Sequence, residues 1–282
     1  MKRVDLIRVP HETKIGDVCG HIEPNITEDC IFYENGVPIG FYIRDISKYS
    51  EKAGKLANIA DTEFRSDRVP KTIMDRSDVV RKAQQEGKSP KQIFAEGRGC
   101  SQMSTLLGGI APKPMVRRPY PSMSQVHGVK SAQTFVKAML MLAHESEKII
   151  RLITPNVWHQ QYEIFQKQVP EEWRFGNLWT SSISNYNISA PFHRDAGNII
   201  GCVNVIIAKK QNATGGNTSV PDYGATIDSC DNSMLVYPAW KNVHGVTPIV
   251  PTSEGGYRNS LVFYPLKAFI SESKIKEFES QK

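Results

Sequence analysis

The chain has 282 residues, with 35 Lys+Arg against 29 Asp+Glu, a formal net charge of +6 and a hydrophobic content of 40%. This length allows one large or two small domains with a real core, and the composition argues against a disordered chain. No apolar run is long enough to cross a membrane and no signal segment opens the chain, so we expect no membrane partner. Five cysteines without a Cys-x-x-Cys pair favour a reducing cytoplasm and no disulfide-linked partner.

The positive charge lies mainly in the first half. Residues 1–130 carry 21 Lys+Arg and 16 Asp+Glu, whereas residues 131–282 carry 14 and 13. Lys and Arg side chains that neutralise phosphates release counterions, so a basic segment fits a polyanionic partner such as a nucleic acid. An ordinary solvated surface fits the same charge, and charge alone leaves both interpretations open.

The first 130 residues are predicted to form an N-terminal extension packed on a core. Two apolar runs, 31–34 and 37–43, flank Asn35-Gly36 and predict a β-hairpin, because both central turn positions favour positive φ. Helices are predicted over 71–86 and from about residue 89. The stretch 97–128, which contains Arg117-Arg118-Pro119-Tyr120, is predicted to be loop.

Residues 131–282 are predicted to form the catalytic domain. Apolar residues at helical spacing predict a long helix over 131–152, and a shorter one follows over 158–168. The period then changes to two, which predicts strands over 178–187, 199–208, 234–238, 246–250 and 260–266. Helices followed by closely spaced strands predict an α+β fold with a rolled or double sheet.

Three residues in the strand-rich part have the chemistry of a metal site. His193 and Asp195 are two positions apart, so in a strand their side chains share a face. His244 comes 51 residues later, at the start of another predicted strand. Two His and one carboxylate are the ligand set of non-haem Fe(II) oxygenases, and they leave the opposite positions on the metal open.

A possible anion site follows in the sequence. Arg258 comes 14 residues after His244 and opens the last apolar strand, and Ser260 shares its face by period two. A guanidinium fork with a hydroxyl beside it suits the carboxylate of a small dicarboxylic acid.

The set His193-x-Asp195, His244 and Arg258-x-Ser260 resembles the 2-oxoglutarate/Fe(II)-dependent dioxygenase superfamily. The resemblance covers residues 178–266 and implies a double-stranded β-helix (jelly-roll) core with flanking helices. Within the superfamily, His193-x-Asp195-x-x-Asn198 is similar to the signature of the TET/JBP branch, whose members oxidise the 5-methyl group of 5-methylcytosine or thymine in DNA. The compact chain favours a small bacterial or phage-type enzyme acting in the cytoplasm, which is the host cytoplasm if a phage encodes it.

The resemblance implies specific roles. His193, Asp195 and His244 would bind Fe(II); Arg258 and Ser260 would bind 2-oxoglutarate, the co-substrate used with O2, and ascorbate would serve as a reductant in vitro. The partner would be DNA containing a 5-methylpyrimidine, whose base must flip to reach iron. Asn198 would hydrogen-bond that base, and its amide, which offers both a donor and an acceptor, leaves 5-methylcytosine and thymine undecided.

Further residues are expected to contact the substrate. Tyr186 and Tyr120 are aromatic and suit stacking on a base, and Arg117 and Arg118 suit phosphate contacts in a DNA-binding loop. Two other functions stay open, namely a hydroxylase of a protein or small molecule and a non-catalytic DNA-binding protein. The first predicts turnover that is independent of salt, and the second predicts no iron binding.

Overall fold

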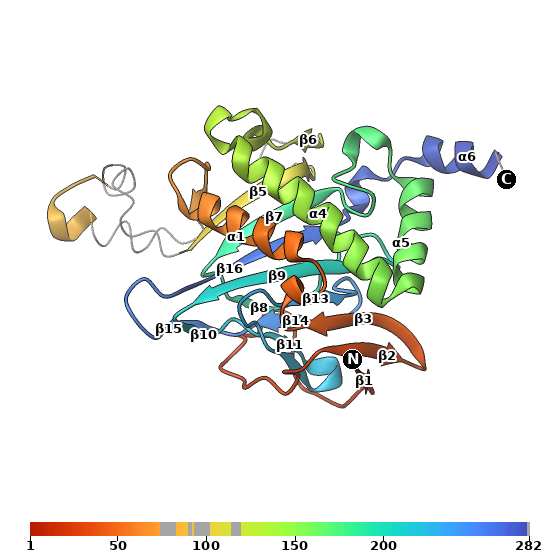
Figure 1. Cartoon of the computed structure of the whole chain (residues 1–282), viewed down its shortest axis with the longest axis horizontal. Helices are drawn as coiled ribbons and strands as arrows, with labels where there is room; N and C mark the ends of the chain where they lie inside the picture. The colour runs from red at the N-terminus through yellow and green to blue at the C-terminus, as the bar shows by residue number, and fades with distance from the viewer. Residues whose placement is uncertain (74–82, 90–91, 93–101, 114–119, 281–282) are drawn as a thin grey trace.

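The structure is a computed structural model that describes residues 1–73, 83–89, 92, 102–113 and 120–280. A large sheet lies in the middle, helices cover one of its faces, and a smaller sheet lies against the other (Figure 1). None of the helices in these ranges is both long and apolar enough to span a membrane. The layers form a double-stranded β-helix flanked by helices, which confirms the α+β fold predicted from the sequence.

The large sheet contains ten strands within the described residues, in the order β1-β2-β3-β13-β9-β16-β7-β5-β4, with β6 paired to β5. All its neighbours are antiparallel except β1 and β2. Its strands are β1 Lys2–Asp5, β2 Cys30–Glu34, β3 Val37–Ile43, β4 Thr72–Ile73, β5 Met103–Ile110, β6 Ser122–Met123, β7 Ser181–Tyr186, β9 Asn204–Gln211, β13 Met234–Tyr237 and β16 Tyr257–Tyr264.

The smaller sheet has the order β12-β11-β14-β8, and a separate ribbon pairs β10 with β15. Its strands are short and antiparallel. The strands outside the large sheet are β8 Ala190–His193, β10 Ala213–Gly215, β11 Thr218–Val220, β12 Ala225–Ile227, β14 His244–Val246 and β15 Ile249–Pro251.

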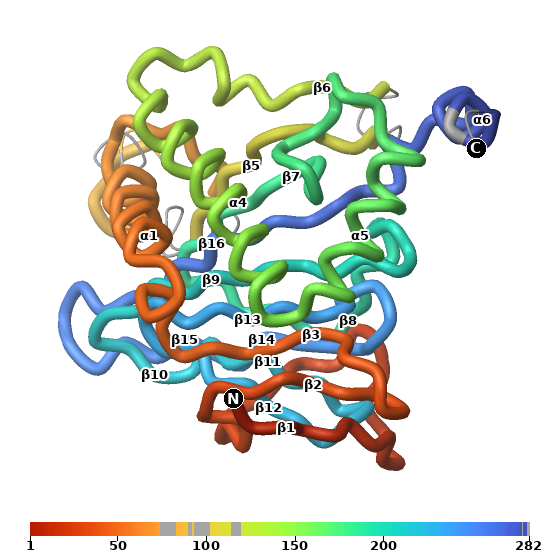
Figure 2. Tube along the Cα trace, turned by 45° about the vertical axis from the view of Figure 1, so that its right-hand side comes forward, coloured from red at the N-terminus to blue at the C-terminus, as the bar shows by residue number. Residues whose placement is uncertain are grey.

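Three helices cover the outer face of the large sheet, and Figure 2 shows them crossing its strands between β5 and β3. They are α1 Glu51–Arg65, α4 Gln133–Ile153 and α5 Pro155–Gln168, and α6 Glu272–Ser280 follows the last strand. The apolar face predicted for α4 is buried: Phe135, Met139 and Leu142 are inaccessible to solvent and pack in the core between helices and sheet. Burial of this stripe fixes the helices on the sheet and leaves the opposite sheet face for the site.

The predicted hairpin is confirmed. Strands β2 and β3 pair across Asn35 and Gly36, which have φ of 51° and 76°. Strand β3 then pairs with β13, and β5 pairs with β7. The division at residue 130 stays a prediction, and strands from both sides of it share one continuous sheet.

Two predictions in the first half are wrong. Met103–Ile110, predicted to be loop, is the strand β5. Thr72–Ile73, at the start of the helix predicted over 71–86, is the strand β4 beside it, whereas residues 83–86 are helical and 74–82 lie outside the described residues. Gly108 and Gly109 caused the first error, because glycine pairs indicate turns. Here they allow close packing: a Cβ on Gly108 would lie 2.5 Å from the Thr180 carbonyl oxygen, and one on Gly109 2.5 Å from the Phe269 ring.

Candidate active site

A cavity of about 530 Å³ lies between the two sheets. Strands β7, β9, β13 and β16 line it from the large sheet, and β8 and β14 line it from the small one. Its lining side chains include both charged and apolar groups: Ile183, Asn185, Ile188, Ala190, His193, Arg194, Asp195, Ala196, Gly197, Asn198, Asn204, Ile206, Tyr237, His244, Val246, Arg258, Ser260, Val262, Tyr264 and Leu266. The cavity therefore gathers the predicted metal ligands and the predicted anion-binding pair.

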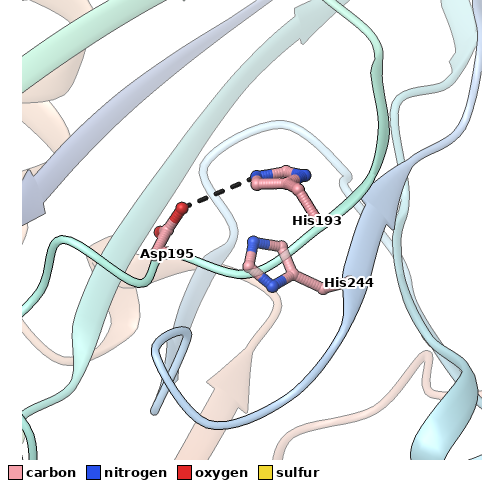
Figure 3. A group of neighbouring side chains, drawn as sticks. All are labelled: His193, Asp195 and His244. Atoms are coloured by element: carbon pink, nitrogen blue, oxygen red, sulfur yellow. Dashed lines mark ion pairs between the residues drawn. The ribbon is translucent and has the colours of Figure 1, made fainter. Parts of the chain in front are cut away.

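His193, Asp195 and His244 converge at one point of this cavity, as Figure 3 shows. His193 ends β8 and His244 begins β14, and the two residues are directly opposite each other in the antiparallel pair. Their ring centroids are 4.3 Å apart, and His193 Nε2 lies 3.6 Å from Asp195 Oδ1. One nitrogen of each ring and a carboxylate oxygen lie within 4.8 Å of one another. The convergence predicted from residues 51 positions apart is thus produced by strand register.

Both imidazoles are oriented by the backbone. His193 Nδ1 lies 2.7 Å from the Pro191 carbonyl oxygen, and His244 Nδ1 lies 3.1 Å from the Asn242 carbonyl oxygen. A carbonyl only accepts, so Nδ1 carries the proton in each bond and Nε2 keeps its lone pair. Burial lowers the pKa of His244, which favours the neutral ring that a metal requires. Two Nε2 atoms and one carboxylate fit a non-haem Fe(II) ion.

The carboxylate is held by two asparagines, which we call the amide relay: Asn198 and Asn204 behind Asp195. Asn204 Nδ2 donates to Asp195 Oδ2 at 2.8 Å, and Asn198 Nδ2 donates to Asn204 Oδ1 at 2.8 Å. A carboxylate bound to a metal only accepts, so it fixes the orientation of both amides in turn. The side-chain carbonyl of Asn198 and the second hydrogen of its amide nitrogen are then left for a ligand. Sequence reasoning missed Asn204, although it is the one polar residue at the start of an otherwise apolar run, Asn204-Val205-Ile206-Ile207.

Arg258 is a buried cation. It is only 2% exposed, its Nε donates to Ser229 Oγ at 2.9 Å, and it forms no ion pair with a carboxylate of the described residues. Burial lowers its pKa to about 10, so it stays charged at neutral pH. A buried charge without a counter-ion costs free energy, and an anionic ligand in the cavity would offset that cost.

The backbone of Arg258 is held by two hydrogen bonds to Asn187. Its N–H donates to Asn187 Oδ1 at 2.9 Å, and the Asn187 N–H donates to the Arg258 carbonyl at 2.8 Å. Ser260 also lines the cavity, whereas Tyr257 and Asn259 turn to the helix side and bind Asp61. The alternation predicted for this strand is confirmed, and it aims the guanidinium and the Ser260 hydroxyl into one space.

The remaining predicted contacts lie elsewhere. Tyr186 does not line the cavity: its ring stacks on Tyr257, 5.5 Å away and 16° from parallel, on the helix side of the sheet. Its neighbour Asn185 faces the cavity instead, as period two requires. Tyr120 is 76% exposed and is not part of the lining. Arg117 and Arg118 lie outside the described residues.

No protein-family model matches the chain, and no curated protein matches it. Among solved structures, NgTET1 in complex with 5mC DNA aligns over 95% of this chain and 92% of that one, with a TM-score of 0.53 and 11% identity. OsALKBH1 covers 79% of this chain and 96% of its own, with a TM-score of 0.37 and 12% identity. An oxidoreductase of the 2OG-Fe(II) oxygenase family from Burkholderia pseudomallei covers 74% and 88%, with a TM-score of 0.32 and 13% identity. The chain therefore shares the overall fold of NgTET1 over most of its length.

Proposed function

We propose that this protein is a 2-oxoglutarate- and Fe(II)-dependent dioxygenase that oxidises the 5-methyl group of a flipped pyrimidine in DNA, with 5-methylcytosine as the substrate base. One observation carries the oxygenase assignment: His193, Asp195 and His244 line the same cavity as a buried arginine, Arg258, that forms no ion pair with any described residue. A metal triad and an anion-binding cation in one cavity are what a 2-oxoglutarate oxygenase requires.

Each residue has a defined task. The two imidazoles and Asp195 would hold Fe(II), and the Nδ1 bonds to Pro191 and Asn242 keep both rings aimed at it. Arg258 and Ser260 would bind the far carboxylate of 2-oxoglutarate and so orient its reactive end toward the metal. When bound, Fe(II) with 2-oxoglutarate and O2 supplies an oxidant that can hydroxylate a methyl group.

Three observations support DNA as the substrate. The NgTET1 structure with the same fold contains 5mC DNA. The first 130 residues carry most of the net positive charge, 21 Lys+Arg against 16 Asp+Glu. The cavity of about 530 Å³ falls in the range of sites that enclose a small ligand, and a flipped base with 2-oxoglutarate is of that size. Arg117, Arg118 and Tyr120 remain proposed contacts to the DNA outside the cavity.

The amide relay is compatible with either 5-methylpyrimidine. Asn198 donates one N–H to Asn204 and keeps a carbonyl acceptor and a second N–H for the base. The carbonyl can pair with the 4-amino group of cytosine and the N–H with the 4-oxo group of thymine, so the choice of 5-methylcytosine rests on the NgTET1 structure with 5mC DNA.

The test is mass spectrometry of nucleosides after incubation of DNA with protein, Fe(II), 2-oxoglutarate, O2 and ascorbate. Matched duplexes should contain cytosine or 5-methylcytosine at the same positions, and the His193→Ala variant is the inactive control. We expect 5-hydroxymethylcytidine from methylated DNA only. Oxidised thymidine would point to a thymine hydroxylase. Succinate release at the same rate with and without DNA, and at low and high salt, would instead favour a protein or small-molecule hydroxylase.

A further inference from the structure

Asp195 is the one of the three metal ligands that lies outside a strand. It follows the end of β8, whereas His193 and His244 lie on paired strands, and its side chain is about one third exposed. Among the described residues, the hydrogen bond from Asn204 is the one that its carboxylate receives from a side chain or an N–H group. Without that bond the carboxylate would be free to rotate toward solvent.

Asn204 is well placed to hold it. Its side chain is only 3% exposed, and its backbone pairs with Tyr237 in the middle of the large sheet. Asn198, 4% exposed, holds the other end of the Asn204 amide at 2.8 Å. Asn198 is itself joined by an isolated antiparallel bridge to Leu266, two residues after the end of β16. Both amides are therefore fixed by burial and by the strand framework.

The relay also joins the two halves of the site. Asp195 belongs to the small-sheet side with both histidines, whereas Asn204 begins β9, which pairs along its length with β16 and so with Arg258. The bond between Asn204 and Asp195 ties the metal side to the strand pair that carries the anion-binding arginine.

We infer that Asn204 is a positioning residue of the metal centre: it sets the orientation of the Asp195 carboxylate and its place relative to Arg258. The inference rests on the metal site of the proposed function and adds a residue that acts only through Asp195. Loss of such a partner to a metal ligand lowers metal affinity about 10–100-fold.

The experiment titrates the full-length protein with Co(II) alone, followed by calorimetry and by the visible absorption of the bound ion. We expect Asn204→Ala to weaken Co(II) binding about 10–100-fold and to change the absorption bands, because the carboxylate reorients. The matched control is Asn177→Ala, which removes the same kind of bond, Asn177 Nδ2 to Glu147 Oε2 at 2.8 Å, away from the cavity. It should lower the melting temperature and leave Co(II) affinity and spectrum unchanged.

A second variant separates the links of the relay. Asn198→Ala leaves the Asn204–Asp195 bond in place, so its effect on Co(II) affinity should be smaller, and the double variant should be no weaker than Asn204→Ala alone. If the losses of Co(II) affinity in the two single variants add up in the double variant, Asn198 does not act through Asn204, which would contradict the relay.

The outcomes are distinguishable. Wild-type affinity and spectrum in Asn204→Ala, with only a lower melting temperature, would overturn the positioning role and leave the proposed function intact. No Co(II) binding by the wild type would overturn the proposed function and this inference together. If Asn204→Ala does not fold, NMR of the wild type decides: on adding Zn(II), the Asn204 side-chain amide resonances should shift while those of Asn177 stay, and an unmoved Asn204 would overturn the inference.

Discussion

Gly216 lies against the side-chain stem of Arg258, so closely that a Cβ atom at position 216 would fall 2.6 Å from Arg258 Cδ and 3.0 Å from Nε. Gly216 has a φ of +72°, which suits glycine as well. Because Gly216 has no side chain, the Arg258 side chain can pass beside it and place its guanidinium in the cavity. The position of Arg258 thus depends on a residue 42 positions earlier in the chain, which no pattern in the sequence indicates.

We expect Gly216→Ala to raise the dissociation constant for 2-oxoglutarate about 10-fold or more, because the new methyl group displaces Arg258. The left-handed backbone adds about 1 kcal/mol of strain. Gly255→Ala is the control, since Gly255 has a φ of +75° and nothing within 4 Å of the added Cβ. Isothermal titration with 2-oxoglutarate in the presence of Mn(II) separates the displacement of Arg258 from the backbone strain. Equal affinities of the two variants for 2-oxoglutarate would contradict the clash with Arg258.

Arg258→Gln should abolish the stabilisation of the protein by 2-oxoglutarate without destabilising the ligand-free form. The reason is that Arg258 is buried and charged and has no carboxylate partner in the part of the chain that the structure describes, so its removal relieves an uncompensated cost. A ligand at about 100 times its Kd should stabilise the wild type by about 2.7 kcal/mol, and the variant not at all. Thermal unfolding with and without 2-oxoglutarate measures both quantities. A ligand-free variant that unfolds several degrees earlier would show that Arg258 is structural.

Asn198→Ala should separate substrate oxidation from co-substrate use. The change removes the acceptor offered to the base, so we expect formation of 5-hydroxymethylcytosine to fall about 5–10-fold, the value of a net hydrogen bond. Asp195 keeps its bond to Asn204, so release of succinate should persist. The ratio of the two products, measured in one reaction, checks this expectation. A parallel fall of both would mean that Asn198 acts on the metal centre instead of the base.

Asp61→Ala should destabilise the fold by roughly 2–4 kcal/mol. Asp61 on α1 is 3% exposed and accepts from Tyr257 Oη at 2.7 Å and Asn259 Nδ2 at 3.0 Å, both on the helix side of β16. Its loss leaves two buried donors without their partner. Urea unfolding should show the effect, and Asp67→Ala, at an exposed position just beyond the end of α1, should change stability by less than about 0.5 kcal/mol.

Most residues of the metal and anion sites could be predicted from the sequence, because their positions follow local patterns. Alternation in a strand puts Arg258 and Ser260 on one face, and the His193-x-Asp195 spacing brings two ligands to one end of β8. The fold class followed from the order of helical and strand periods. The meeting of His193 with His244 depends instead on the register of β8 and β14, which local patterns do not give.

Residues whose roles depend on sheet packing were not predictable in this way. Asn204 reaches Asp195 because β9 packs beside the loop that follows β8, and Ser229 reaches Arg258 because its loop packs against that arginine. Neither contact produces a periodic pattern in the sequence. The same limit explains Tyr186. Tyr186, an aromatic residue in the strand before the ligands, suggests stacking on a base. Because side chains alternate along the strand, however, Tyr186 faces the helices and its neighbour Asn185 faces the cavity.

The central claim is that His193, Asp195 and His244 bind one Fe(II) ion beside a 2-oxoglutarate held by Arg258. Its most direct test is anaerobic titration of the Fe(II)-loaded protein with 2-oxoglutarate, followed by the visible charge-transfer absorption of the chelate. We expect a saturable band at one equivalent of iron, absent in His193→Ala and shifted to higher 2-oxoglutarate concentrations in Arg258→Gln. A wild-type protein that gives no band, or a band that His193→Ala leaves unchanged, would contradict the claim.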